Sequence, residues 1–337
     1  MSIKTSVQVV KSCLYRLRKR LSAKRRKITA PLIRQEFLKE FLKAIQPRIL
    51  DVGARGGPLP RLNVLAPFSH LFLCEPDIVE AERIGEKLRR KNFWQSVTMI
   101  PEALAEKQGS VILHMTEKAG LSSLFEPNPS FVRTYCVPCG APEVPWLVSA
   151  RRWEVVDRIK VPAITLDEAA EKYGIDGITF LKLDTQGTEL AILQGGVKRV
   201  LPSVLAILVE MEFVSVYRQQ PLFSEVHMFL ENHGFRVMGF RNAELRRFTN
   251  IRIPYSQGEV GWTHALYFRE RKEDGTALRA SEITGLIPYA IAFEYFDYAL
   301  WYLDDPYVQA YLNERGWKGI AEEVASYAKE YGIVRGR

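Results

Sequence analysis

An acid and a glycine loop near the start of the chain suit the binding of a charged cofactor. A short apolar run ends in Asp51, and the segment Asp51–Gly57 (DVGARGG) begins at that residue. Glycines let the backbone approach a ligand closely, and the N-terminus of a following helix offers free N–H groups. Dinucleotide-binding proteins use a similar loop, but an acid directly before its first glycine is a poor neighbour for a pyrophosphate. Such an acid suits the ammonium and sulfonium groups of S-adenosylmethionine.

A second acid, Glu75, lies at the tip of the next predicted strand, 24 residues after Asp51. An acid about 20 residues beyond the glycine loop can accept hydrogen bonds from both ribose hydroxyls. The alternative is an exposed turn acid before Pro76. The expected cofactor site is made of Asp51, Gly53, Arg55, Gly56, Gly57, Glu75, Pro76, Asp77, Ala103, Leu104 and Asp184.

Asp184 belongs to the segment Phe180–Leu190 (FLKLDTQGTEL), which is typical of a buried strand followed by a turn and a helix. Ligands of an open α/β sheet lie beyond the carboxyl ends of its strands, so Asp184 should face the crevice. It could position the methionine amine, accept a substrate proton, or only cap the following helix.

Glu210 and Glu212 close the next predicted strand, where residues at i and i+2 face the same side. One of them could accept the substrate proton. The alternative is one solvent-exposed acid and one salt-bridged acid. The candidate catalytic residues are therefore Asp184, Glu210 and Glu212, and His264, which enters the last predicted strand, is a further candidate base.

No metal site is expected. A metal at Asp184 has no clear second ligand. Cys136 and Cys139 form a lone C-x-x-C motif without a second pair or a histidine at ligand spacing, so we expect free thiols there. Ser122 and Ser123 precede a proline-rich segment and are candidates for lining the pocket.

Strands and helices alternate along the body of the chain, which predicts a doubly wound α/β fold with a mostly parallel sheet. Several of the expected strands are near-continuous apolar runs, as buried parallel strands require. The expected strands are 47–51, 70–74, 96–100, 110–115, 178–183, 204–209, 235–240 and 265–268, with helices over 81–90 and 225–233.

Two further regions interrupt or follow this α/β domain, which we place at residues 41–272. Residues 117–162 are rich in proline and lack periodicity, which indicates a lid or insert. A C-terminal extension begins at residue 273, and 277–337 predicts two or three helices. The apolar stretch 286–303 contains Glu294 and Asp297, so we expect a buried amphipathic helix rather than a membrane span.

Basic charge is concentrated in an N-terminal arm, residues 1–40. The net charge is +8, yet residues 1–30 hold ten basic residues and no acid, while the rest of the chain holds 37 basic and 39 acidic residues. This distribution disfavours a nucleic-acid substrate, which needs a basic face on the working domain. The arm is either a helix lying on an anionic membrane surface or a solvated helix packed on the body. Four scattered cysteines and no readable signal peptide favour a cytoplasmic protein, with the arm allowing peripheral contact at the inner membrane face.

The order of these motifs resembles the FkbM family of methyltransferases. The resemblance spans about residues 48–268 and depends on ILDVGARGG, FLCEPD, EALAEKQGS, AITLDE, FLKLDTQGTELAILQGG and LVEMEF. It implies a class I methyltransferase fold, S-adenosylmethionine as cofactor, and usually a hydroxyl acceptor on a polyketide, sugar or glycan. It assigns family motif positions to Asp51, Gly53, Gly56, Glu75, Asp167, Asp184, Gly187 and Glu189. Gln186 departs from the Glu of many members, which weakens a role for this position as a metal ligand or base.

We therefore expect methyl transfer from S-adenosylmethionine to a hydroxyl on a sugar, glycan or secondary metabolite. The sulfonium already activates the methyl group, so the protein mainly aligns donor and acceptor and helps to remove a proton. A non-catalytic binding or scaffold protein with the same fold is one alternative, and a nucleotide-cofactor oxidoreductase is a weaker one. The complete cofactor motif set favours an enzyme.

Overall fold

The computed structural model describes residues 33–139, 148–249 and 257–335. The basic segment 1–30 and Cys13 lie outside the described residues, as do residues 140–147 of the predicted lid. Among the described residues, no helix is long and apolar enough to cross a membrane.

A seven-stranded sheet forms the centre of the molecule, in the order β11-β12-β10-β9-β1-β2-β3. Only β12 runs antiparallel to its neighbours in this sheet. This is the mostly parallel α/β sheet that the alternating strands and helices predicted. Its strands are β1 (Arg48–Val52), β2 (His70–Cys74), β3 (Ser96–Ile100), β9 (Phe180–Leu183), β10 (Ala206–Glu212), β11 (Phe235–Leu245) and β12 (Glu259–Arg269).

Helices cover both faces of the sheet, because alternate residues of its strands belong to two different hydrophobic clusters. On β9, for example, Phe180 packs on one face and Leu181 on the other. The first face is covered by α2 (Glu36–Ile45), α3 (Ile78–Lys91) and the C-terminal helices. The second face is covered by α5 (Leu166–Tyr173), α6 (Glu189–Gln194) and α7 (Phe223–Asn232). Short 3-10 turns η1 (Pro60–Val64), η2 (Ala66–Phe68) and η5 (Leu201–Ser203) complete the connections.

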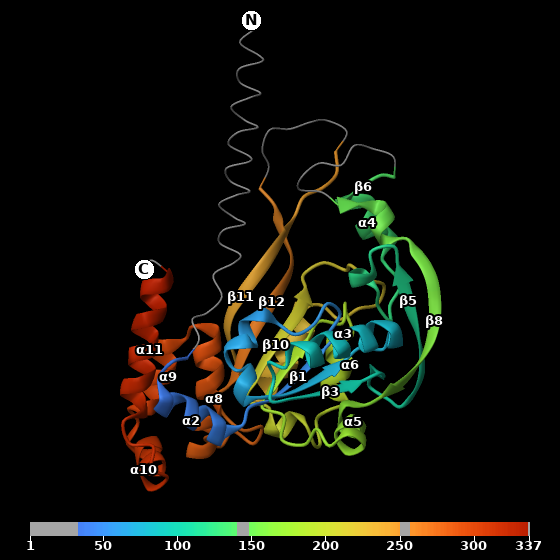
Figure 1. The fold of residues 1–337 in the computed structure, drawn as a ribbon. Coiled ribbons are helices and arrows are strands. Elements are labelled where there is room, and N and C mark those ends of the chain that lie inside the picture. Colours follow the sequence, from blue (N-terminus) through green and yellow to red (C-terminus); the bar gives the residue numbers. More distant parts are fainter. Residues whose placement is uncertain (1–32, 140–147, 250–256, 336–337) are drawn as a thin grey trace, which may run out of the picture.

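The C-terminal extension contains four helices among its described residues, where the sequence predicted two or three. It contains α8 (Ala280–Phe293), α9 (Phe296–Leu303), α10 (Pro306–Glu314) and α11 (Ile320–Arg335), and these pack beside α2 at one side of the sheet (Figure 1). The prediction of a single helix over 286–303 is wrong, because two helices share this stretch. Glu294 adopts a left-handed conformation with φ 71°, which ends α8 and starts a new helix two residues later.

The proline-rich segment 117–162 is more structured than a lid without periodicity would be. It contains η3 (Ala119–Leu121), α4 (Pro129–Tyr135), β6 (Cys136–Val137), β7 (Val148–Ser149), η4 (Ala150–Trp153) and most of β8 (Val155–Ile164). β8 pairs with β5 (Gly109–Thr116) and β4 (Ala103–Leu104) in a separate three-stranded sheet. The predicted strand 110–115 therefore exists, but outside the main sheet. β8 escaped prediction because most of its residues are exposed, so no apolar alternation marks it.

Candidate functional site

A row of polar side chains crosses the first face of the sheet at the carboxyl ends of its parallel strands. Each polar residue lies two positions from an apolar core residue of the same strand, and therefore on the same face. The pairs are Ile49 and Asp51 on β1, Phe180 and Lys182 on β9, Leu208 and Glu210 on β10, and Leu266 and His264 on β12. The sheet thus changes from a hydrophobic core to a charged row within two residues.

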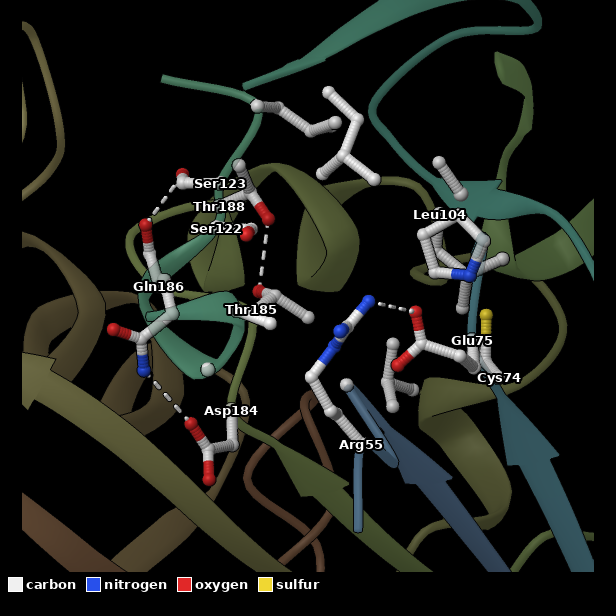
Figure 2. A pocket seen from close by; sticks show the side chains of 18 residues that line it. Arg55, Cys74, Glu75, Leu104, Ser122, Ser123, Asp184, Thr185, Gln186 and Thr188 are labelled. Atoms are coloured by element: carbon white, nitrogen blue, oxygen red, sulfur yellow. Dashed lines mark hydrogen bonds and ion pairs between the residues drawn. The ribbon is translucent and has the colours of Figure 1, made fainter. Parts of the chain in front are cut away.

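A cavity lies beyond these strand ends and is lined by most of the residues predicted to bind the cofactor (Figure 2). Its walls include Gly53, Arg55, Glu75, Pro76, Ala103, Leu104 and Asp184. Ser122 and Ser123 also line it, as the sequence suggested, and Ser123 donates a hydrogen bond of 2.7 Å to the carbonyl oxygen of Gln186. The sequence analysis missed Thr185, Gln186 and Thr188 as lining residues, although they belong to the motif that contains Asp184.

Glu75 and Arg55 stand on the opposite side of this cavity from Asp184 and Gln186 (Figure 2). Glu75 is buried at the tip of β2, and its Oε1 lies 3.5 Å from the Arg55 guanidinium. The predicted alternative of an exposed turn acid is therefore wrong. Burial raises the pKa of Glu75, and the charge of Arg55 opposes that rise. A buried carboxylate with a cation beside it is an acceptor for hydroxyl groups that reach the cavity.

Gly53 is required where the loops after β1 and β9 meet. Its φ is 74°, and a Cβ on this residue would lie 1.9 Å from the carbonyl oxygen of Asp184. The glycine therefore lets two strand-end loops touch, which places Arg55 and Asp184 at one cavity.

Asp51, Gly56, Gly57 and Asp77 do not line the cavity, although we predicted them for the cofactor site. Asp51 is fully buried, and its Oδ1 lies 2.9 Å from Lys182 Nζ. Asp77 caps α3 by accepting from the Glu80 N–H. Asp77 also lies 2.7 Å from Arg55, so it supports a lining residue instead of contacting the cavity itself.

Asp184, Glu210 and His264 form a cluster whose ligand atoms all lie within 4.8 Å of one another. His264 Nε2 is 3.7 Å from Asp184 Oδ2 and 3.6 Å from Glu210 Oε1. The Gln186 amide donates a hydrogen bond of 3.0 Å to Asp184 Oδ1 and a second hydrogen bond to Glu210 Oε2. The expectation that Asp184 has no neighbouring ligand group is therefore wrong, because the sheet brings Glu210 and His264 to it.

Asp184 does not cap the next helix, because α6 begins at Glu189 and its N-terminal flanking residue is Thr188. Burial raises the pKa of Glu210 well above its ordinary value, and the charge of Asp184 adds to the rise. Burial acts in the same direction on Asp184, but its contact with His264 and the charge of Lys182 outweigh burial and lower the pKa of Asp184. The pKa values of these two neighbouring carboxyl groups are therefore shifted in opposite directions.

Glu212 is buried on the same face of β10 as Glu210, so the alternative with one solvent-exposed acid is wrong. Burial and the charge of Glu189 raise the pKa of Glu212. Glu189 accepts from the N–H groups of Thr185 and Gly187, at 2.7 and 2.9 Å, and so holds the loop that carries Gln186. Asp167, another family motif position, accepts backbone N–H groups of residues 198–200 and lies away from the cavity.

A second cavity, of about 340 Å³, lies on the other side of the cluster. His264 lines it, together with residues of η1, β10, β11, β12 and the α8–α9 junction: Leu59, Arg61, Leu208, Gly239, Phe240, Arg241, Leu266, Phe293 and Tyr295. Asp184 lines the first cavity and lies 3.7 Å from His264, so the cluster borders both spaces. The C-terminal helices contribute directly to this second wall.

The order of this seven-stranded sheet, with one antiparallel strand and a cavity across the ends of β1, β2 and β9, is that of a class I methyltransferase-like fold. Residues 141–237 match the family model described as the methyltransferase FkbM domain. This segment of the chain is therefore similar to the methyltransferase FkbM domain, as the order of its motifs predicted. None of the curated proteins matches the chain.

Three solved structures have low sequence identity and low TM-scores to this chain. The FkbM methyltransferase of Methylobacillus flagellatus KT is 16% identical with a TM-score of 0.38, and the match covers 66% of this chain and 44% of that one. A precorrin-6y C5,15-methyltransferase of Geobacter metallireducens is 13% identical with a TM-score of 0.31, covering 72% and 91%. M. capricolum TrmK, solved with S-adenosyl-homocysteine, is 10% identical with a TM-score of 0.29, covering 88% and 98%. The present chain thus spans less than half of the M. flagellatus protein.

Proposed function

We propose that this protein transfers the methyl group of S-adenosylmethionine to a hydroxyl oxygen of a small molecule or of a glycan end. The observation that carries the proposal is the cluster of Asp184, Glu210 and His264 at the border of the two cavities. A hydroxyl must lose its proton during methylation, and this cluster provides oxygen and nitrogen acceptors at that border.

The cofactor occupies the first cavity, and the acceptor occupies the second. The ribose of the cofactor lies against Glu75, and the methionine end points towards Asp184 on the far side of the first cavity. The acceptor enters the second cavity, so that its hydroxyl reaches His264 beside Asp184. The volume of about 340 Å³ suits a small molecule or one sugar unit, and nucleic acid is not the substrate we propose.

The alternative of a scaffold protein with a methyltransferase fold is less well supported. A scaffold has no need for buried carboxylates, and burying a charge is costly unless it is paired. Here Glu75 and Glu210 are buried despite that cost, and Asp184 lines the first cavity in a half-buried position. An oxidoreductase is disfavoured, because Asp184 lines the first cavity at the strand ends, where it would repel the pyrophosphate of a dinucleotide.

The test uses S-adenosylmethionine carrying a ¹³C-labelled methyl group. The full-length protein is incubated with this cofactor and a deproteinised small-molecule extract of the cells that make it. Carbon–proton correlation NMR separates methyl groups on oxygen from those on nitrogen, sulfur and carbon. We expect new O-methyl signals that are absent without protein. Labelled methyl groups only on nitrogen, sulfur or carbon would contradict hydroxyl methylation, and no label transfer from a stable cofactor complex would favour the scaffold.

A further inference from the structure

We propose that Asp184, Glu210 and His264 hold a divalent transition-metal ion at the border of the two cavities. Among the described residues, this is the one group of three or more His, Cys, Asp or Glu side chains close enough to share an ion. Cation binding itself is independent of the proposed function. Its consequence deepens that function, because the ion would bind and activate the acceptor hydroxyl.

The distances within the cluster fit a shared ion better than direct hydrogen bonds. His264 Nε2 lies 3.7 Å from Asp184 Oδ2 and 3.6 Å from Glu210 Oε1, beyond hydrogen-bonding distance. Two ligands bound to one ion at ~2.1 Å are about 3.0–3.5 Å apart. A movement of a few tenths of an ångström would therefore bring all three atoms to one ion.

Gln186 orients the carboxylates of Asp184 and Glu210 so that one oxygen of each is free to bind an ion. Its amide nitrogen donates to Asp184 Oδ1 and to Glu210 Oε2, so one oxygen of each carboxylate is occupied. The other oxygens, Asp184 Oδ2 and Glu210 Oε1, are those that approach His264 Nε2. The Tyr217 hydroxyl lies 2.9 Å from both Gln186 Oε1 and the carbonyl oxygen of Leu121, so its one proton is shared between these two acceptors. Such partners behind the ligands orient them and support metal affinity.

Carboxylates outnumber cationic side chains around the cluster. Five carboxylates lie in or beside it, namely Asp51, Asp184, Glu189, Glu210 and Glu212. Within the described part of the chain, the printed ion pairs of these acids involve one lysine, Lys182, and the imidazole of His264. Buried negative charge without a partner is costly, and a divalent cation would remove most of this cost.

The donor set indicates the kind of ion. Two carboxylate oxygens and one imidazole nitrogen suit Mn²⁺, Fe²⁺ or Zn²⁺ better than Ca²⁺, which prefers oxygen ligands alone. Three protein ligands leave positions open, and the cluster borders both cavities, so an acceptor oxygen can reach the ion. Metal coordination lowers the pKa of a bound hydroxyl, which would favour release of its proton to water.

The test measures Mn²⁺ binding without cofactor or acceptor. Full-length protein is freed of metal with a chelator, and the electron paramagnetic resonance signal of free Mn²⁺ is followed as protein is added. We expect one ion per chain, with affinity lowered at least about tenfold in Asp184→Asn and in His264→Gln. Melting temperatures of the variants verify that they are folded. Glu231→Gln is the matched control, because the exposed Glu231 lies 3.6 Å from the half-buried His227, and no second carboxylate forms an ion pair with this histidine in the described part of the chain.

The outcomes separate this inference from the proposed function. Absence of Mn²⁺ binding, or equal binding by wild type, Asp184→Asn and His264→Gln, would overturn the cation site and leave methyl transfer to oxygen standing. Binding that is lost only in the cluster variants supports the site. If Mn²⁺ binds at the cluster while the labelled methyl never reaches oxygen, the proposed function fails and the cation site remains.

Discussion

Lys182 Nζ lies 2.9 Å from Asp51 Oδ1, so a lysine of β9 neutralises the fully buried acid at the end of β1. Burial would lower the pKa of Lys182, but the charges of Asp51 and Asp184 outweigh burial and raise it. The lysine therefore stays charged. It joins β1 to β9 at the place where the cofactor cavity opens, and it lies 3.5 Å from Asp184.

We predict that Lys182→Met destabilises the fold strongly, because it leaves Asp51 buried without its cation. Breaking a buried pair from one side costs about 3–5 kcal/mol of unfolding free energy. The double variant Asp51→Asn with Lys182→Met should recover much of the loss. Urea unfolding measures both. The control is Lys43→Met, which removes a lysine of an exposed pair and should leave the unfolding free energy nearly unchanged. If Lys182→Met were as mild as this control, the pair would not stabilise the site.

The contact between Asp51 and Lys182 could not be predicted from the sequence. The position of Asp51 before a glycine loop was visible in the sequence, and it suggested a contact with the cofactor cation. Lys182 lies on another strand, far along the chain, and nothing in the sequence spacing shows that the two side chains meet. Main-sheet strands were predictable because a buried parallel strand must be apolar on both faces. β8 was not, because its residues are mostly exposed.

The cluster of Asp184, Glu210 and His264 was predictable only in part, for the same reason. Asp184 and Glu210 stand at strand ends, which the sequence pattern locates. His264 joins them because β12 runs antiparallel to β10 and pairs His264 with Glu210, a register that no local signal specifies. The role of Gln186 depends on its left-handed backbone, with φ 62°, which turns its amide towards both carboxylates.

Glu75 should bind the ribose of the cofactor. We predict that Glu75→Ala lowers affinity for S-adenosylmethionine by about 1.5–3 kcal/mol, the range for hydrogen bonds to a charged group. Glu82→Ala, an exposed acid on α3, is the control and should leave affinity unchanged. Calorimetric titration of both variants decides the matter. An unchanged affinity in Glu75→Ala would remove Glu75 from the site.

Asp184 should act in the chemical step, and the structure leaves no capping role for it. We predict that Asp184→Asn folds normally and loses turnover by about 10²–10⁴-fold. Asp176→Asn, which changes an exposed acid paired with Arg199, should keep full turnover. Single-turnover methylation and cofactor affinity are measured on the same preparations. Weakened cofactor binding would make Asp184 a contact of the methionine amine. Full activity would move the catalytic assignment to Glu210 and Glu212.

The basic segment 1–30 should bind anionic membrane surfaces without contributing to cofactor binding. Each basic residue near such a surface contributes about 1 kcal/mol. We predict that deletion of residues 1–30 abolishes sedimentation with vesicles containing phosphatidylserine and leaves S-adenosylmethionine affinity unchanged. Vesicles of neutral lipid are the control. The membrane hypothesis fails if the full-length protein does not sediment with anionic vesicles at low salt.

The cavity between Glu75 and Asp184 should bind S-adenosylmethionine and not a dinucleotide. Calorimetric titration of the full-length protein with S-adenosylmethionine and, separately, with NAD distinguishes these ligands. We predict one S-adenosylmethionine per chain and no measurable heat from NAD. Binding of NAD, with S-adenosylmethionine giving no heat at the same protein concentration, would rule out this assignment of the cavity.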